Sequence, residues 1–189
     1  MLYYREDKRM NRQIYKTKNV IFEALLRKMQ VKNYHEITII EITEDADVAR
    51  LSFYRHFKTK EDIILFKFKD IIDKIVRKIF ATGMDIPKEI LELILGVIES
   101  YKSTFNVIIK HNLYGLIVQS FSSDIRVITK KITNLEDSDA YLLTFYEGAL
   151  INLLIEWVSN ENAVSKNEYL KIIDNIFNKQ RLLLKTNNI

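Results

Sequence analysis

The chain has 189 residues, of which 48% are apolar and 29% charged, and its net charge is +4. It contains four glycines, one proline and no cysteine. Strand-rich folds need turn residues at short intervals, so this scarcity predicts an all-α protein.

Without cysteine, disulfides and thiolate metal sites are excluded. No apolar run approaches the roughly 20 residues of a membrane span. The N-terminus has no apolar segment typical of a secretory signal. We therefore expect a cytoplasmic protein with no membrane partner.

Positive charge is concentrated in the N-terminal third. Residues 1–60 hold thirteen Lys or Arg and eight Asp or Glu, whereas residues 61–189 hold sixteen and seventeen. This asymmetry predicts an anionic partner for the N-terminal segment, although a solvated basic surface would have the same composition.

The first predicted helix covers residues 12–31, where apolar residues recur at helical spacing. Arg12 and Lys16 lie on its polar face and are candidate outer contacts to a nucleic acid. Residues 1–9 are expected to form an N-terminal extension, and both Met1 and Met10 fit a translation start.

Two short helices joined by a tight turn are predicted next. Thr38 and Glu41 have the spacing of a capping box, in which each side chain accepts a backbone N–H at the start of a helix. Asp47 suits the turn, because a short carboxylate tolerates the left-handed backbone conformation. The second helix is predicted from about residue 49 to 56. Such a pair of helices is a helix-turn-helix, which places its second helix in the DNA major groove.

The second short helix carries the candidate DNA contacts on its outer face. Phe53 and Phe57 lie four residues apart and are expected to pack inward. Arg50 can donate two hydrogen bonds to guanine, and Leu51 can meet a thymine methyl group. The predicted contacts to bases and phosphates, besides the two on the first helix, are Thr38, Arg50, Leu51, Ser52, Tyr54, Arg55, His56 and Lys60.

The remainder of the chain is predicted to be a larger helical domain for ligand binding and dimerisation. A break at residues 82–87, with Pro87 in the first turn of the next helix, marks the boundary between the two domains. The predicted DNA-binding domain is residues 10–65 and the second domain residues 82–189. The helices predicted after residue 59 are about 60–81, 87–104, 138–159 and 166–184, with a less regular helical region at 105–132.

Aromatic side chains of the second domain form a candidate effector pocket, because ligand pockets are largely aromatic and apolar. Core packing explains each ring as well. The candidates are Tyr101, Phe105, His111, Tyr114, Phe121, Tyr146 and Trp157.

Two helices near the C-terminus are apolar over much of their circumference, which predicts a partner surface and most simply a second copy of the chain. The predicted dimer contacts are Leu143, Leu150, Leu153, Leu154, Ile172, Ile173, Ile176 and Phe177.

The segment from Thr38 to Ile64 resembles the DNA-binding signature of the tetracycline-repressor (TetR/AcrR) family. Its most specific elements are Phe53-Tyr54-Arg55-His56-Phe57 and Lys60-Glu61-Asp62. The resemblance implies dimers that bind DNA through the second short helix, with Tyr54, His56 and Lys60 at phosphates and residues 50–52 facing bases. The family usually has Gly where this chain has Asp47, usually Ala at Thr43, and often Ser at Ala49.

The sequence Phe145-Tyr-Glu-Gly-Ala followed by Glu156-Trp157 is similar to a C-terminal subtype found in regulators of dihydroxyacetone kinase operons. Together these features predict a dimeric repressor of a double-stranded DNA operator, controlled by a small-molecule effector or a partner protein. The alternative is an adapter that acts through a protein partner and binds DNA weakly. No metal, cofactor or enzyme activity is predicted, because metal-ligand spacings and nucleophile–base groups are missing.

Overall fold

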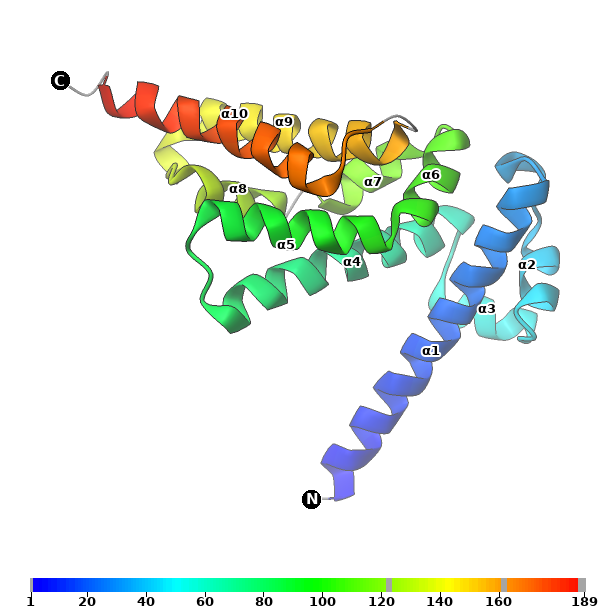
Figure 1. Cartoon of the computed structure of the whole chain (residues 1–189). Coiled ribbons are helices and arrows are strands. Elements are labelled where there is room, and N and C mark those ends of the chain that lie inside the picture. Colours follow the sequence, from blue (N-terminus) through cyan, green and yellow to red (C-terminus); the bar gives the residue numbers. More distant parts are fainter. Residues whose placement is uncertain (1, 122–123, 161–162, 187–189) are drawn as a thin grey trace. The chain divides into compact units, whose positions relative to one another are not determined.

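The computed structural model describes residues 2–121, 124–160 and 163–186, and this part of the chain consists of helices joined by turns (Figure 1). The all-α prediction is therefore confirmed. The described α-helices are α1 (Leu2–Val31), α2 (Ile39–Asp45), α3 (Arg50–His56), α4 (Lys60–Thr82), α5 (Pro87–Ser100), α6 (Lys102–Lys110), α7 (Tyr114–Phe121), α8 (Ile125–Thr133), α9 (Ala140–Ser159) and α10 (Lys166–Thr186), and two 3-10 helices are η1 (Tyr34–Glu36) and η2 (Asp137–Asp139).

The chain forms two compact units, which we call the head and the body. The head comprises Met1–Phe68 and Val107–Ile117, and the body comprises Lys69–Asn106 and Val118–Ile189. Helix α4 thus begins in the head and ends in the body, and a short segment from the middle of the chain joins the head. This division into compact units does not test the predicted functional domains. Their limits, residues 10–65 and 82–189, stay a prediction.

Helix α1 begins at Leu2, well before the predicted start at Arg12. Residues 2–11 contain neither glycine nor proline, so the sequence has no helix breaker there. Met1, one of the two residues that fit a translation start, lies outside the described residues. Further along, the apolar face of α1 is buried where the helix packs on α2 and α3.

Three helices begin at a capping box or at proline, and the predicted signals at Thr38 and Pro87 are confirmed. At α2, the Thr38 backbone N–H donates to the Glu41 carboxylate (2.8 Å), and the Glu41 N–H donates to the Thr38 hydroxyl (3.2 Å). Ser165 and Glu168 make the same reciprocal pair before α10. Pro87 occupies the first turn of α5. Local sequence therefore determines where these helices begin.

The body is built around α5, which packs against α8, α9 and α10, while α8 also packs on α9 (Figure 1). The region predicted as irregular, residues 105–132, contains most of α6 and α8 and all of α7. Asn112 follows α6 and Asn134 follows α8, each with φ of 60°. Asparagine ends helices in this left-handed conformation much as glycine does. The sequence analysis did not identify these two asparagines as signals for the ends of α6 and α8.

The segment 137–159, which includes α9, is long and apolar enough by length and composition to cross a membrane. Core helices of soluble proteins pass the same test. Seven side chains of α9 are buried within the chain, among them Leu143, Leu150 and Val158. The core of the body thus accounts for part of the apolar character of α9.

Candidate nucleic-acid interface

Helix α3 has one buried face and one exposed face. Phe53 and Phe57 are buried, and their ring centroids lie 5.9 Å apart. On the opposite side Arg50, Leu51 and Tyr54 are exposed, and Leu51 retains 64% of its accessible surface. Burial of the two aromatic rings fixes the rotation of this seven-residue helix. The packing of Phe53 and Phe57 therefore directs the apolar side chain of Leu51 outward.

The exposed side chains of α3 are partly ordered by one another. The Arg50 guanidinium donates to the Tyr54 hydroxyl at 3.4 Å and lies 5.7 Å from the centre of the Tyr54 ring. Arg55 is also exposed, whereas Ser52 and His56 are half-buried. The face is cationic at its start and aromatic one turn later, a combination suited to a polyanion.

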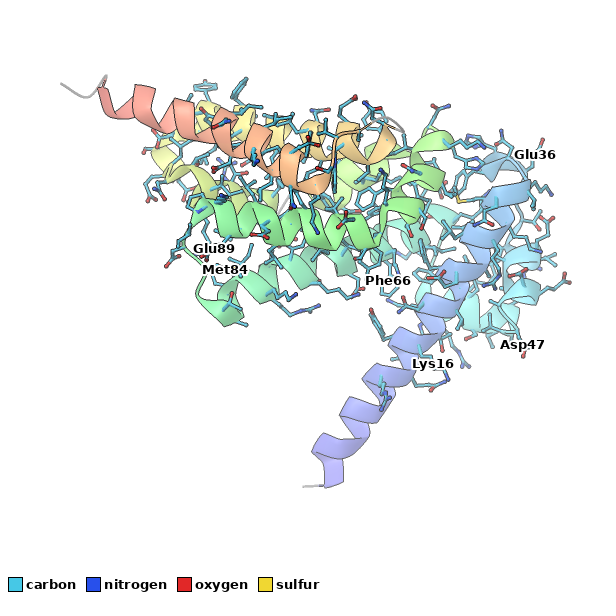
Figure 2. All side chains as sticks on the ribbon, viewed as in Figure 1. Lys16, Glu36, Asp47, Phe66, Met84 and Glu89 are labelled. Carbon is cyan, nitrogen blue, oxygen red and sulfur yellow. The ribbon has the colours of Figure 1, made fainter. Side chains whose placement is uncertain are left out.

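The turn before α3 depends on Asp47. Its φ is 51°, and the following Val48 N–H donates to the Thr43 carbonyl at 3.0 Å, which closes the end of α2. The predicted left-handed conformation is confirmed. Asp47 is exposed at the edge of the head (Figure 2). Its carboxylate therefore adds negative charge beside α3.

Ala49 is the N-cap residue of α3 and has no side chain that could accept a hydrogen bond. A serine there would typically stabilise the helix by about 1 kcal/mol. In this head α3 is instead held by the burial of its rings.

Lys60 is directed inward, toward the chain itself. Its ammonium donates to the backbone carbonyls of Tyr34 (2.8 Å) and Ile37 (2.7 Å) and lies 4.5 Å from the centre of the Tyr34 ring. Burial lowers the pKa of Lys60. These contacts hold η1 and the residue before Thr38, so the side chain positions the start of α2. Sequence reasoning, which expected a phosphate contact, had no signal for this role.

The remaining predicted contacts differ in exposure. Arg12 and Lys16 are exposed and line a hollow along α1, where Lys16 is visible in Figure 2. Thr38 is exposed, but its hydroxyl donates to Glu41 at 2.9 Å. Burial, with the nearby positive charge of Lys18, lowers the pKa of His56. The lowered pKa favours the neutral imidazole, which has one N–H donor.

Ion pairs connect α1 to α2 at two points. The Arg27 guanidinium donates to the Asp45 carboxylate at 2.8 Å, which lowers the pKa of Asp45. Lys32 donates to Glu41 at 2.9 Å. The Thr38 backbone N–H, with help from Lys32, lowers the pKa of Glu41 to about 2. Asp45 at the end of α2 is therefore fixed on α1, and Glu41 near its start on Lys32, the residue that follows α1.

His111 belongs to the segment of the head that follows α6. Its Nδ1 accepts from the Tyr34 backbone N–H (3.3 Å), and its Nε2 lies 2.7 Å from the Met29 carbonyl oxygen. This pattern requires a neutral ring with the proton on Nε2. The Tyr34 hydroxyl donates to Glu61 at 2.7 Å, and burial, followed by Glu61, raises the pKa of Tyr34. His111 thus connects this segment to α1 and η1.

The predicted effector residues are divided between the two units. His111 and the exposed Tyr114 lie in the head, whereas the other five lie in the body. Within the body they contribute to separate ring contacts: Phe105 with Phe121, Tyr146 with Phe177, and Trp157 with Tyr169. Tyr101 lines a cavity between α4 and α5. Several of these rings therefore pack in the core of the body, and the effector pocket stays a prediction.

Most of the predicted dimer contacts are buried within the single chain. The buried ones are Leu143, Leu150, Leu154, Ile173 and Phe177. Ile172 and Ile176 are exposed on α10, and Leu153 is half-buried. Tyr141 and Phe145, which are not among the predicted dimer contacts, are 94% and 62% exposed on α9. Periodicity identified apolar helices but could not assign each face to the core or the surface.

Within the described residues, no group of three or more His, Cys, Asp or Glu is placed to hold a metal ion.

Comparisons with known proteins agree with this arrangement. Residues 21–65 match the family described as bacterial regulatory proteins, tetR family, and residues 85–179 match a transcriptional regulator C-terminal region. A TetR transcriptional regulator from Streptococcus agalactiae has a similar structure, with 21% identity, a TM-score of 0.60 and coverage of 90% of this chain and 98% of that chain. Dihydroxyacetone kinase operon activator DhaS is similar at 17% identity and a TM-score of 0.64, over 88% and 97% of the two chains. The search of curated proteins found no match.

Proposed function

The chain belongs to the TetR family of transcriptional regulators, and from this premise we propose that it is a cytoplasmic homodimeric repressor that binds a palindromic operator. An effector or partner on the body sets its affinity for DNA. The exposed face of α3, with Arg50, Leu51 and Tyr54 held outward by buried Phe53, is the observation that carries the proposal.

In the proposed complex α3 enters the major groove, which is wide enough for one helix. Arg50 donates to guanine and Leu51 contacts a thymine methyl group. Tyr54 and His56 donate to phosphates, while Arg12 and Lys16 strengthen binding electrostatically. Lys60 acts as a positioning residue, since two of its three N–H donors already bond backbone carbonyls.

The proposed dimer surface consists of the exposed side chains Tyr141 and Phe145 on α9 and Ile172 and Ile176 on α10. Helices α9 and α10 lie alongside each other in the body (Figure 1). Large apolar groups exposed together favour burial against a partner. A two-fold axis would pair this surface with its own copy, and the two α3 helices would then read two half-sites of a palindrome. Replacing Tyr141 and Phe145 with serine should shift the protein to monomers in analytical ultracentrifugation.

Binding to an operator selected from the protein's own genome tests the proposal. Fluorescence anisotropy should give sequence-dependent binding that weakens steeply with salt, as phosphate contacts require. Arg50→Ala with Tyr54→Ala should weaken this binding by about 100-fold or more, since each base or phosphate contact contributes ~1–3 kcal/mol. Lys88→Gln, which removes one exposed positive charge from the body, is the matched control. Equal binding of unrelated DNA would contradict the proposal.

An adapter that acts through a protein partner is the second candidate. The uncapped start of α3 at Ala49 and the exposed carboxylate of Asp47 both disfavour tight DNA binding and support this reading. If a reporter gene responds unchanged to the Arg50→Ala, Tyr54→Ala variant, the adapter is favoured. Since one structurally similar protein is an operon activator, the direction of that response also decides between repression and activation.

A further inference from the structure

Helices α4 and α5 line a cavity of about 510 Å³ within the body. Its volume falls in the range of small-molecule sites, ~300–1,000 Å³. Helix α4 contributes Lys74, Arg77 and Lys78 at helical spacing, so that all three cations share one wall. None of the seven side chains that line this cavity is acidic. The cavity is therefore more basic than the body as a whole.

Among the described residues, only Lys74 of the three cations has a counter-ion. Lys74 donates to the Asp70 carboxylate and to the Tyr101 hydroxyl, both at 2.8 Å. Arg77 and Lys78 are exposed and make no side-chain ion pair within the described part of the chain. An anion between two such neighbouring cations gains from both and relieves their mutual repulsion.

The rest of the lining is largely apolar and small. Ala81 and Val97 lie on the two helices, and the Tyr101 ring adjoins them. Ser100 donates its hydroxyl proton to the Val97 carbonyl at 2.6 Å, which leaves its oxygen as an acceptor only. Basic groups and an apolar floor in one cavity suit a molecule that is charged at one end.

We propose that this cavity binds a small amphipathic anion, with its carboxylate or phosphate between Arg77 and Lys78 and its apolar body against Ala81 and Val97. Such a ligand would be the effector. Its role as effector rests on the proposed function, but its binding to the cavity is independent of that function. Helix α4 is continuous from Lys60 to Thr82. A ligand at its C-terminal half thus acts on the helix whose first residue positions α2.

Isothermal titration with 1-naphthyl phosphate and decanoate as probes tests binding in the full chain. Both probes should bind at least about tenfold more tightly than 1-naphthol, decanol or inorganic phosphate, since only the probes combine charge with an apolar body. Arg77→Gln with Lys78→Gln should remove this preference. Ala81→Phe should block binding while leaving every charge in place. Lys88→Gln is the control and should bind both probes as the unchanged chain does.

Failure of both probes to bind, or equal binding by the Arg77→Gln, Lys78→Gln variant and the control, would overturn the cavity proposal. A second measurement separates it from the proposed function. Saturating probe should change operator affinity at least about fivefold in the unchanged chain and not in the variant. If the probes bind but no operator is recognised, the proposed function fails and the cavity stands. If they bind without changing operator affinity, the role as effector is overturned.

Discussion

In the head, α2 and α3 have seven residues each, whereas α5, α9 and α10 in the body have 14, 20 and 21. A seven-residue helix buries few side chains, and α2 and α3 bury three between them. Hydrogen bonds that Lys60 and Arg27 donate and Glu41 accepts hold the two ends of α2, whereas α3 is held by the burial of Phe53 and Phe57. The long helices of the body bury up to seven side chains each. Apolar burial thus positions the long helices of the body, whereas α2 in the head also depends on polar contacts at both of its ends.

Truncation of the body core should have the largest effect. Leu150 is fully buried on α9, so Leu150→Ala is expected to lower the free energy of unfolding by about 2–5 kcal/mol. Urea unfolding followed by the fluorescence of Trp157, the single tryptophan, measures it. Val127→Ala, at an exposed position on α8, is the control and should change stability by less than about 0.5 kcal/mol. Similar losses in both variants would contradict the assignment of Leu150 to the core.

Loss of the Lys60 side chain should increase local unfolding of the head without affecting the body. Lys60→Met removes two hydrogen bonds from a charged donor and should destabilise the head by about 3 kcal/mol. Hydrogen exchange should accelerate in residues 34–45 but not in α9. Lys58→Met is the control, since Lys58 is exposed. Unchanged exchange would show that apolar contacts alone hold the head.

A smaller change in the opposite direction is expected at the turn. Asp47→Gly should stabilise the head by about 1 kcal/mol, because glycine adopts φ of 51° without steric penalty. Asp47→Asn keeps a polar side chain but removes the charge. Operator affinity should therefore rise in both variants, and thermal stability mainly in Asp47→Gly. A rise in affinity with glycine alone would assign the effect to the backbone.

The smallest effect is expected from Glu41→Gln. The pKa of Glu41 is lowered to about 2 from an ordinary value of 4.5. The folded chain therefore prefers the carboxylate, and this contribution is complete above pH 4.5 and is lost as the pH falls toward 2. Glutamine keeps an acceptor for the Thr38 N–H but does not titrate. Between pH 4.5 and 2 the free energy of unfolding should therefore fall less in the variant than in the unchanged chain. Superimposable profiles of unfolding free energy against pH would contradict the prediction.

Features that depend on neighbours in sequence could be predicted. The capping box of Thr38 and Glu41 involves residues three positions apart, and the left-handed turn at Asp47 follows from a short polar side chain between two helices. The inward direction of Phe53 follows from periodicity. Each of these depends on the chemistry of a few adjacent residues, which the sequence displays directly.

Features that depend on distant partners could not be predicted. Lys60 bonds carbonyls 26 and 23 residues away, and His111 bonds Met29 at a separation of 82 residues. The two exposed rings of α9 look in the sequence like the buried Tyr146 beside them. A helix that is apolar all around has no periodicity that distinguishes its inner from its outer face.

The grouping of Val107–Ile117 with Met1–Phe68 has a practical consequence for exchanging parts between relatives. A graft that stops at Phe68 would separate the Met29 carbonyl and the Tyr34 N–H from the imidazole that bonds both. The head is therefore encoded in two separate stretches of the gene. Chimeras that exchange the head between relatives will need to carry both stretches together, with His111 as the residue that joins them.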